Sequence, residues 1–150
     1  MSEQALLRFS QKARKAVGLK GRVSLLLTSN REMQHLNRCF RGKNKPTDVI
    51  SFPAVDIVTD KFAGDLAISV DIASANARSF GHSPKEELCV LILHGMLHLA
   101  GYDHERDSGE MARKEARLRR ELGLPTGLIA RTENLTASVR KAVKRPRRTR

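Results

Sequence analysis

The chain has 150 residues, a formal net charge of +12 and a sequence pI near 10.5. This length suits one domain with a hydrophobic core and is short for two. Apolar residues occur in short periodic blocks, none approaching the roughly 18 residues of a membrane-spanning helix, and no signal-peptide pattern opens the chain. Two cysteines, Cys39 and Cys89, imply no disulfide framework. We therefore expect a soluble, cytoplasmic protein without a membrane partner.

Positive charge is concentrated at the C-terminus. Residues 140–150 hold seven of the 28 Lys and Arg residues and no acidic residue, so the rest of the chain carries a formal charge of +5. Basic surfaces bind polyanions through counterion release, and blocks of like charge are commonly disordered. We expect a domain at residues 1–123 and an extension at 124–150 ending in a basic, disordered tail. Whether the tail binds RNA or is only a solvated end stays open.

The first half of the chain alternates helix and strand patterns. Residues 3–17 place apolar side chains at helical spacing before a glycine stop, and the apolar run 23–27 predicts a strand. A Ser-x-x-Glu capping box at 29–32 opens a second helix that reaches about residue 40. Residues 49–52 and 66–70 predict two further strands. Residues 54–63 show no firm pattern, although Asp56 to Val58 could extend the strand before them.

Three helices are predicted after residue 70. Asp71 can cap one that runs through Phe80, and Asp107 a charged helix that ends at Gly123. Between them, Ser83-Pro-Lys-Glu86 is a strong helix start, followed by nearly continuous apolar residues. A helix that is apolar all round is buried, so this is the predicted central core helix.

The end of that helix carries a metal-site pattern, H-x-x-x-H-x-x-G-x-x-H. Residues His94 and His98 share one helical face, and Gly101 can reverse the chain so that His104 returns to them. Three imidazoles suit zinc and leave a fourth position open, which favours catalysis over a purely structural ion. Nickel or copper would accept the same ligands. We expect one zinc ion (Zn²⁺) or another divalent transition metal.

The same spacing occurs in metzincin proteases, where a glutamate follows the first histidine as general base. Here that position is Gly95, so a metzincin-like metalloprotease would have to recruit Asp103, Glu105 or a distant acid. Phosphoryl transfer needs such a base less, because positive groups can stabilise the developing charge. The pattern therefore favours phosphate chemistry.

A basic loop at residues 41–48 supplies those positive groups. Its cations Arg41, Lys43 and Lys45 are candidate substrate-binding residues, and a guanidinium matches two phosphate oxygens. Asp103 is expected either to orient a ligand histidine or to stabilise a turn. Tyr102 is expected to be a packing residue and Cys89 a buried core residue. His35 and His82 lack ligand spacing and are expected to be surface or turn residues.

Three ordered motifs resemble the bacterial YbeY family. They are Phe40-Arg-Gly-Lys with Lys45-Pro-Thr-Asp-Val-Ile-Ser-Phe-Pro53, then Gly64-Asp-Leu-Ala-Ile-Ser69, then the histidine segment 94–104. The resemblance covers about residues 30–122. It does not cover the basic extension.

The resemblance implies a single-strand-specific, metal-dependent endoribonuclease that acts in ribosomal RNA processing, at the 16S rRNA 3′ end, and in ribosome quality control. It implies zinc on His94, His98 and His104, with Arg41 and His94 as catalytic candidates. The implied fold is α+β: a single domain in which about five helices surround a small mixed sheet. Expected partners are single-stranded RNA, ribosomal RNA and the small ribosomal subunit, without DNA. A non-catalytic ribosome assembly factor with a structural metal is the alternative.

Overall fold

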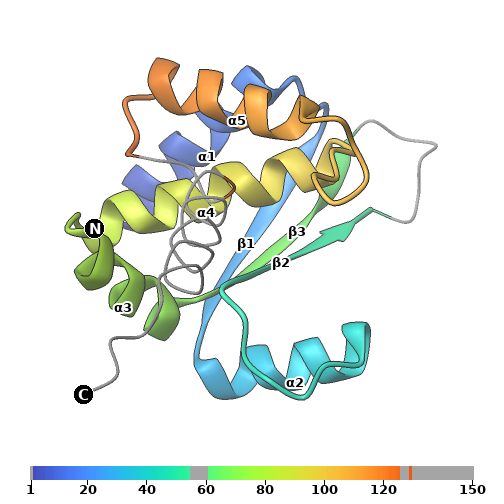
Figure 1. Cartoon of the computed structure of the whole chain (residues 1–150), viewed down its shortest axis with the longest axis vertical. Helices are drawn as coiled ribbons and strands as arrows, with labels where there is room; N and C mark the ends of the chain where they lie inside the picture. The colour runs from blue at the N-terminus through green and yellow to red at the C-terminus, as the bar shows by residue number, and fades with distance from the viewer. Residues whose placement is uncertain (1, 55–60, 126–128, 130–150) are drawn as a thin grey trace, which may run out of the picture.

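The structure is a computed structural model that describes residues 2–54, 61–125 and 129 (Figure 1). The elements, in chain order, are α1 (Glu3–Val17), β1 (Arg22–Thr28), α2 (Asn30–Arg41), β2 (Val49–Pro53), β3 (Phe62–Ser69), α3 (Val70–Phe80), α4 (Pro84–Leu99) and α5 (Glu110–Glu121). The possible strand extension at 56–58 and the basic tail lie outside the described residues. The five helices and small mixed sheet of the described residues confirm the predicted α+β class.

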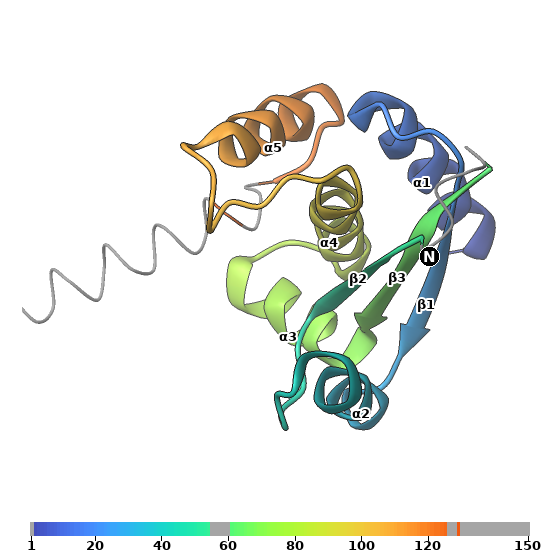
Figure 2. The same ribbon diagram turned by 90° about the vertical axis from the view of Figure 1, so that its right-hand side faces the viewer.

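Within the part of the chain that the structure describes, the sheet has three strands in the order β1-β3-β2, with β1 parallel and β2 antiparallel to the central β3. Successive side chains of a strand point to opposite faces. Leu66 and Ile68 of β3 accordingly belong to the main core, whereas Ala67 packs with Met33 of α2 and with Ile50. Helices α1, α4 and α5 gather on one side of the sheet and α2 on the other (Figures 1 and 2).

Helix α4 is the buried centre of the fold, as predicted. The Ser83 hydroxyl accepts a hydrogen bond from the Glu86 amide, and the Glu86 carboxylate accepts one from the Ser83 amide, which completes a capping box. An unbroken run of α4, residues 89–97, is buried. Such a helix cannot shift without disturbing the whole core, so it holds its side chains in fixed positions. None of the described helices is long and apolar enough to cross a membrane.

The boundary between β3 and α3 differs from the prediction. Ser69, not Asp71, caps α3: its hydroxyl accepts from the Ile72 amide, while the Asp71 carboxylate accepts from the amide of Asn30. Assigning the cap to Asp71 was therefore wrong, as was extending the strand to residue 70. The strand also begins earlier, at Phe62, because its first residues pair with the neighbouring strands.

The start of α5 follows the predicted pattern more closely. The carboxylate of Asp107 accepts hydrogen bonds of 2.9 Å from the amides of Gly109 and Met111. These bonds hold the pKa of Asp107 below its ordinary value, with the Met111 amide as the largest cause. The helix itself begins three residues later, at Glu110, and its N-cap is Gly109, so Asp107 is not the N-cap that the sequence predicted. Asp107 thus stabilises the first turn from outside the helix.

Candidate metal centre and adjoining cavity

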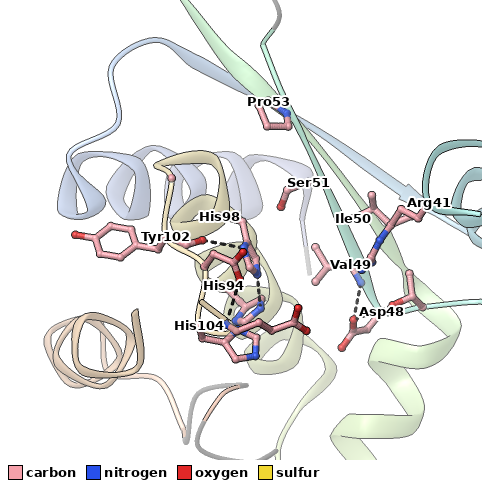
Figure 3. A pocket seen from close by; sticks show the side chains of 14 residues that line it. Arg41, Asp48, Val49, Ile50, Ser51, Pro53, His94, His98, Tyr102 and His104 are labelled. Carbon is pink, nitrogen blue, oxygen red and sulfur yellow. Dashed lines mark hydrogen bonds between the residues drawn. The ribbon is translucent and has the colours of Figure 1, made fainter. Parts of the chain in front are cut away.

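Three imidazoles meet at the C-terminal end of α4 (Figure 3). The Nε2 atoms of His94 and His98, one helical turn apart, lie 3.1 Å from each other. His104 returns to them because Gly101 adopts a left-handed conformation with φ of 96°. Its ring centroid lies 6.1 Å from that of His94 and 6.2 Å from that of His98. One nitrogen from each ring lies within 4.8 Å of the others, so the predicted histidines are brought together.

Hydrogen bonds at the Nδ1 atoms of His94 and His98 fix the orientation of these two imidazole rings. Nδ1 of His94 lies 2.7 Å from Oε2 of Glu115, and Nδ1 of His98 lies 3.0 Å from the Tyr102 carbonyl oxygen. A carboxylate and a carbonyl only accept hydrogen bonds, so each Nδ1 carries the proton and each Nε2 offers its lone pair. This outer support is typical of histidines that bind metal.

The donor set fits a zinc ion. Tetrahedral zinc with bonds of about 2.0–2.1 Å to nitrogen requires ligand nitrogens roughly 3.3 Å apart, and the His94 and His98 atoms nearly meet that spacing. Nδ1 of His104 is buried without a hydrogen-bond partner in the described part of the chain. Burial, and next the proximity of His94, lower the pKa of His98. Both effects favour the neutral form of His98, which is the form that binds metal.

A cavity of about 520 Å³ opens beside the three histidines. Arg41, the last residue of α2, lines it together with Asp48 and Ser51 from the loop and strand that follow (Figure 3). Helix α2 ends there because Gly42 takes the left-handed conformation. Residues about 50 positions apart in the chain thus share one cavity. Lys43 and Lys45 are exposed on the same loop and do not line it.

A hydrogen bond connects strand β2 to helix α4 at the cavity wall. The Ser51 hydroxyl donates a hydrogen bond of 3.0 Å to the carbonyl oxygen of Gly95. A β-carbon at position 95 would lie only 2.7 Å from the Cδ2 atom of buried Leu66. A side chain here would require buried Leu66 to shift. The packing of α4 on the sheet therefore disfavours the general-base glutamate of the metzincin pattern at this position.

Other residues singled out from the sequence have structural contacts. The Asp103 carboxylate accepts from the Glu105 amide, and its carbonyl oxygen accepts from the amides of Arg106 and Asp107, so Asp103 stabilises a turn. Tyr102 packs against the main core. His35 is exposed, as expected.

His82 is only partly the predicted turn residue. Its ring, 8% exposed, lies 2.7 Å from the carboxylate of buried Glu87. Its side chain is therefore not a surface group. Cys89 is buried, as predicted, and burial raises the pKa of its thiol to about 11.

Glu115 is the site residue that sequence reasoning missed. It lies on α5, is 2% exposed, and occurs 21 positions after the histidine that it contacts. A signal was present: Glu115 shares the buried face of its helix with Met111 and Leu118, at spacings of four and three residues. An acidic residue on an apolar helical face requires a buried partner.

The fold and site define a small α+β protein in which three histidines able to hold a metal ion share a cavity with an arginine. The profile of the Endoribonuclease YbeY family matches residues 2–123, and the chain belongs to that family.

Named relatives support the assignment. An Endoribonuclease YbeY from Koribacter versatilis is 55% identical over 148 residues, covering 99% of this chain and 93% of the relative. One from Solibacter usitatus is 47% identical over 130 residues, covering 87% and 86%. A solution structure of a Thermotoga maritima protein is similar with a TM-score of 0.56 and 32% identity, covering 81% of this chain and 84% of that one.

Proposed function

We propose that this chain is a zinc-dependent endoribonuclease that cuts single-stranded RNA. It would act in the cytoplasm, in ribosomal RNA processing at the 16S rRNA 3′ end and in ribosome quality control. The family and the names of the relatives support an RNA substrate. The observation that carries the proposal is the cavity that Arg41 and the three histidines line together. The same cavity is lined by a cation that can bind phosphate and by three histidines that can hold a metal ion.

Arg41 and His94 are the proposed catalytic residues. The guanidinium of Arg41 can donate two parallel hydrogen bonds to the scissile phosphate and stabilise the charge that develops there. His94, with His98 and His104, would hold the zinc ion. When bound, zinc supplies Lewis acidity and lowers the pKa of a bound water toward ~7. The nucleophile is water or the 2′-hydroxyl of the RNA, and a cyclic 2′,3′-phosphate product would identify the latter.

Substrate binding is proposed for Arg41, Lys43 and Lys45 together. Arg41 reaches the cavity, whereas the exposed lysines on the adjoining loop would contact phosphates on either side of the cut. Such contacts to the backbone give weak sequence preference. The proposed partners are therefore single-stranded RNA, ribosomal RNA and the small ribosomal subunit. DNA and membranes are not expected partners.

The alternative is an assembly factor that binds the ribosome and keeps its metal for structure. Replacing Arg41 separates the two functions. Arg41→Ala should lower the cleavage rate of a single-stranded RNA about 10²-fold or more, because a charge-stabilising group is removed, while RNA binding is largely kept. Arg38→Ala is the matched control, since Arg38 is exposed one turn earlier on α2 and does not line the cavity.

Both variants must be shown to be folded and zinc-loaded before the cleavage assay. Cleavage by Arg41→Ala at the wild-type rate would contradict the role of Arg41 and favour the assembly factor. The same preparations should be tested on casein. Cleavage of casein, with RNA left intact, would restore the protease interpretation.

A further inference from the structure

The carboxylate of Glu115 connects a metal-ligand histidine to the chain beyond α5. Its Oε2 atom lies 2.7 Å from Nδ1 of His94, and its Oε1 atom accepts a hydrogen bond of 2.9 Å from the amide of Ile129. Glu115 is 2% exposed and Ile129 3% exposed. Both carboxylate oxygens therefore accept hydrogen bonds from buried residues.

Burying a carboxylate is costly unless each oxygen has a partner. The two partners of Glu115 come from different places in the sequence: His94 from α4, and Ile129 from six positions beyond the matched segment 2–123. The Ile129 side chain packs into the main core with Met111 and Leu118. The amide of Ile129 is thus anchored where it faces the carboxylate.

The hydrogen-bond acceptor at Nδ1 of His98 is weaker than the one at Nδ1 of His94. Its Nδ1 donates to the neutral carbonyl oxygen of Tyr102, whereas His94 donates to a carboxylate. A charged acceptor makes a stronger hydrogen bond and increases the basicity of the opposite ring nitrogen. His94 is also the more buried of the two α4 histidines, so its ring orientation depends on the contacts around it.

We infer that Glu115, held by the amide of Ile129, is the positioning residue for His94. It fixes the proton on Nδ1 and aims Nε2 at the metal, and Ile129 supports the metal site through it. Glu115 is not a catalytic residue, because it touches no reacting atom. This inference rests on the proposed zinc site and assigns to Ile129, in the C-terminal extension, a part in metal binding.

The chain contains its own control. Glu87 lies on α4, the same helix as His94, and is fully buried. One of its carboxylate oxygens lies 2.7 Å from Nε2 of His82, and the other accepts a hydrogen bond from the side-chain amide of Asn76. Neither His82 nor Glu87 belongs to the three-histidine group. Glu87→Gln therefore disturbs a comparable buried carboxylate and histidine pair on the same side of the sheet, away from the zinc ligands.

The test is zinc affinity of the full-length chain, measured by competition with a chromophoric chelator. Glu115→Gln should weaken zinc binding about 10–100-fold, and zinc should raise its thermal unfolding midpoint less than it raises that of the wild type. Glu87→Gln should bind zinc as the wild type does. Equal affinity of Glu115→Gln and wild type, or an equal loss in Glu87→Gln, would overturn the positioning role. A wild-type chain that binds no zinc would instead remove the proposed zinc site, and this role with it.

The amide of Ile129 is tested separately. Ile129→Pro removes the N–H group, whereas Ile129→Val keeps it with nearly the same apolar side chain. The proline variant should lose zinc affinity and the valine variant should retain it. Wild-type affinity in Ile129→Pro, alongside a loss in Glu115→Gln, would limit the positioning role to Glu115.

Discussion

Gly95 and Leu66 are packed so closely that a β-carbon on residue 95 would lie 2.7 Å from the Cδ2 atom of Leu66. A second methyl group of Leu66 would lie at 3.2 Å and the Ser51 hydroxyl at 3.3 Å. Leu66 is fully buried at the centre of β3, so a shift of its methyl groups would disturb the surrounding core. The packing of helix on sheet therefore disfavours a side chain at the position next to His94, the first of the three histidines.

Gly95→Ala should destabilise the protein despite the better helix propensity of alanine. Overpacking a filled core typically costs about 1–3 kcal/mol, which exceeds the gain of up to ~1 kcal/mol expected from alanine in a helix. Chemical denaturation of the metal-free protein measures the difference. The double variant with Leu66→Ala should lose less stability than the sum of the two single variants, because the second change makes room for the added methyl. Simple additivity would show that the two residues do not compete for space.

The two cysteines should react very differently with iodoacetamide. Cys39 is exposed, whereas Cys89 is 4% exposed and burial raises the pKa of its thiol to about 11. At pH 8 roughly a thousandth of Cys89 would be thiolate, the reactive form. Mass spectrometry of the native protein should find Cys39 alkylated and Cys89 free, and both alkylated after unfolding. Rapid native labelling of Cys89 would contradict the burial of α4.

Asp107 should stabilise α5 in a pH-dependent way. The amides of Met111 and Gly109 lower its pKa from the ordinary value of 3.8, so the folded state binds this proton less readily than the unfolded state. The contribution is then fully present above about pH 4 and is lost as pH falls through the lowered pKa. Asp107→Ala should have a lower thermal midpoint than wild type at pH 6, and the gap should shrink below pH 3.8.

The control for Asp107 is Glu121→Ala, which removes an exposed carboxylate at the other end of α5. Its thermal midpoint should stay close to that of the wild type across the same pH range. A gap between Asp107→Ala and wild type that is constant from pH 6 to pH 2 would mean that Asp107 acts through packing rather than through its charge.

Lys43 and Lys45 should contribute to RNA affinity and not to the chemical step. Removing one lysine–phosphate ion pair from a single-stranded complex reduces the slope of log affinity against log salt by about 0.7. Lys43→Ala and Lys45→Ala should show this change with little change in the rate at saturating RNA. Lys12→Ala is the control, because Lys12 is an exposed residue of α1, which lies on the other side of the sheet from α2. Equal slopes in all three variants would remove the loop lysines from the binding surface.

Much of this fold could be predicted because its signals are local. The Ser83 capping box and the apolar run after it define α4 within a few residues, and the histidine spacing with Gly101 needs only one helical turn and one reversal. Local signals could not predict that Ser69 caps α3 while Asp71 accepts a hydrogen bond from the amide of Asn30. Either side chain can cap a helix, and the choice depends on Asn30, which contacts both residues from about 40 positions away.

Glu115 illustrates the same limit at the site. Its charge suggests a surface residue, whereas its spacing from Met111 and Leu118 suggests a buried one, and the contact with His94 across two helices decides between them. The close approach of Gly95 to Leu66 is likewise a property of the packed helix and sheet. Arg41 was a better candidate from sequence, because a basic loop next to a strand already suggested a phosphate-binding role. The shared cavity adds its position beside the histidines.

We propose that the three histidines and Arg41 form a zinc-dependent site for cutting RNA. The most direct measurement is the zinc content of the purified full-length chain together with its cleavage of an end-labelled single-stranded RNA, before chelation, after chelation and after zinc is restored. We predict one zinc ion per chain, cleavage that chelation abolishes and zinc restores, and little cutting of the same RNA in a duplex. Undiminished cleavage of single-stranded RNA by the zinc-free chain would contradict the claim.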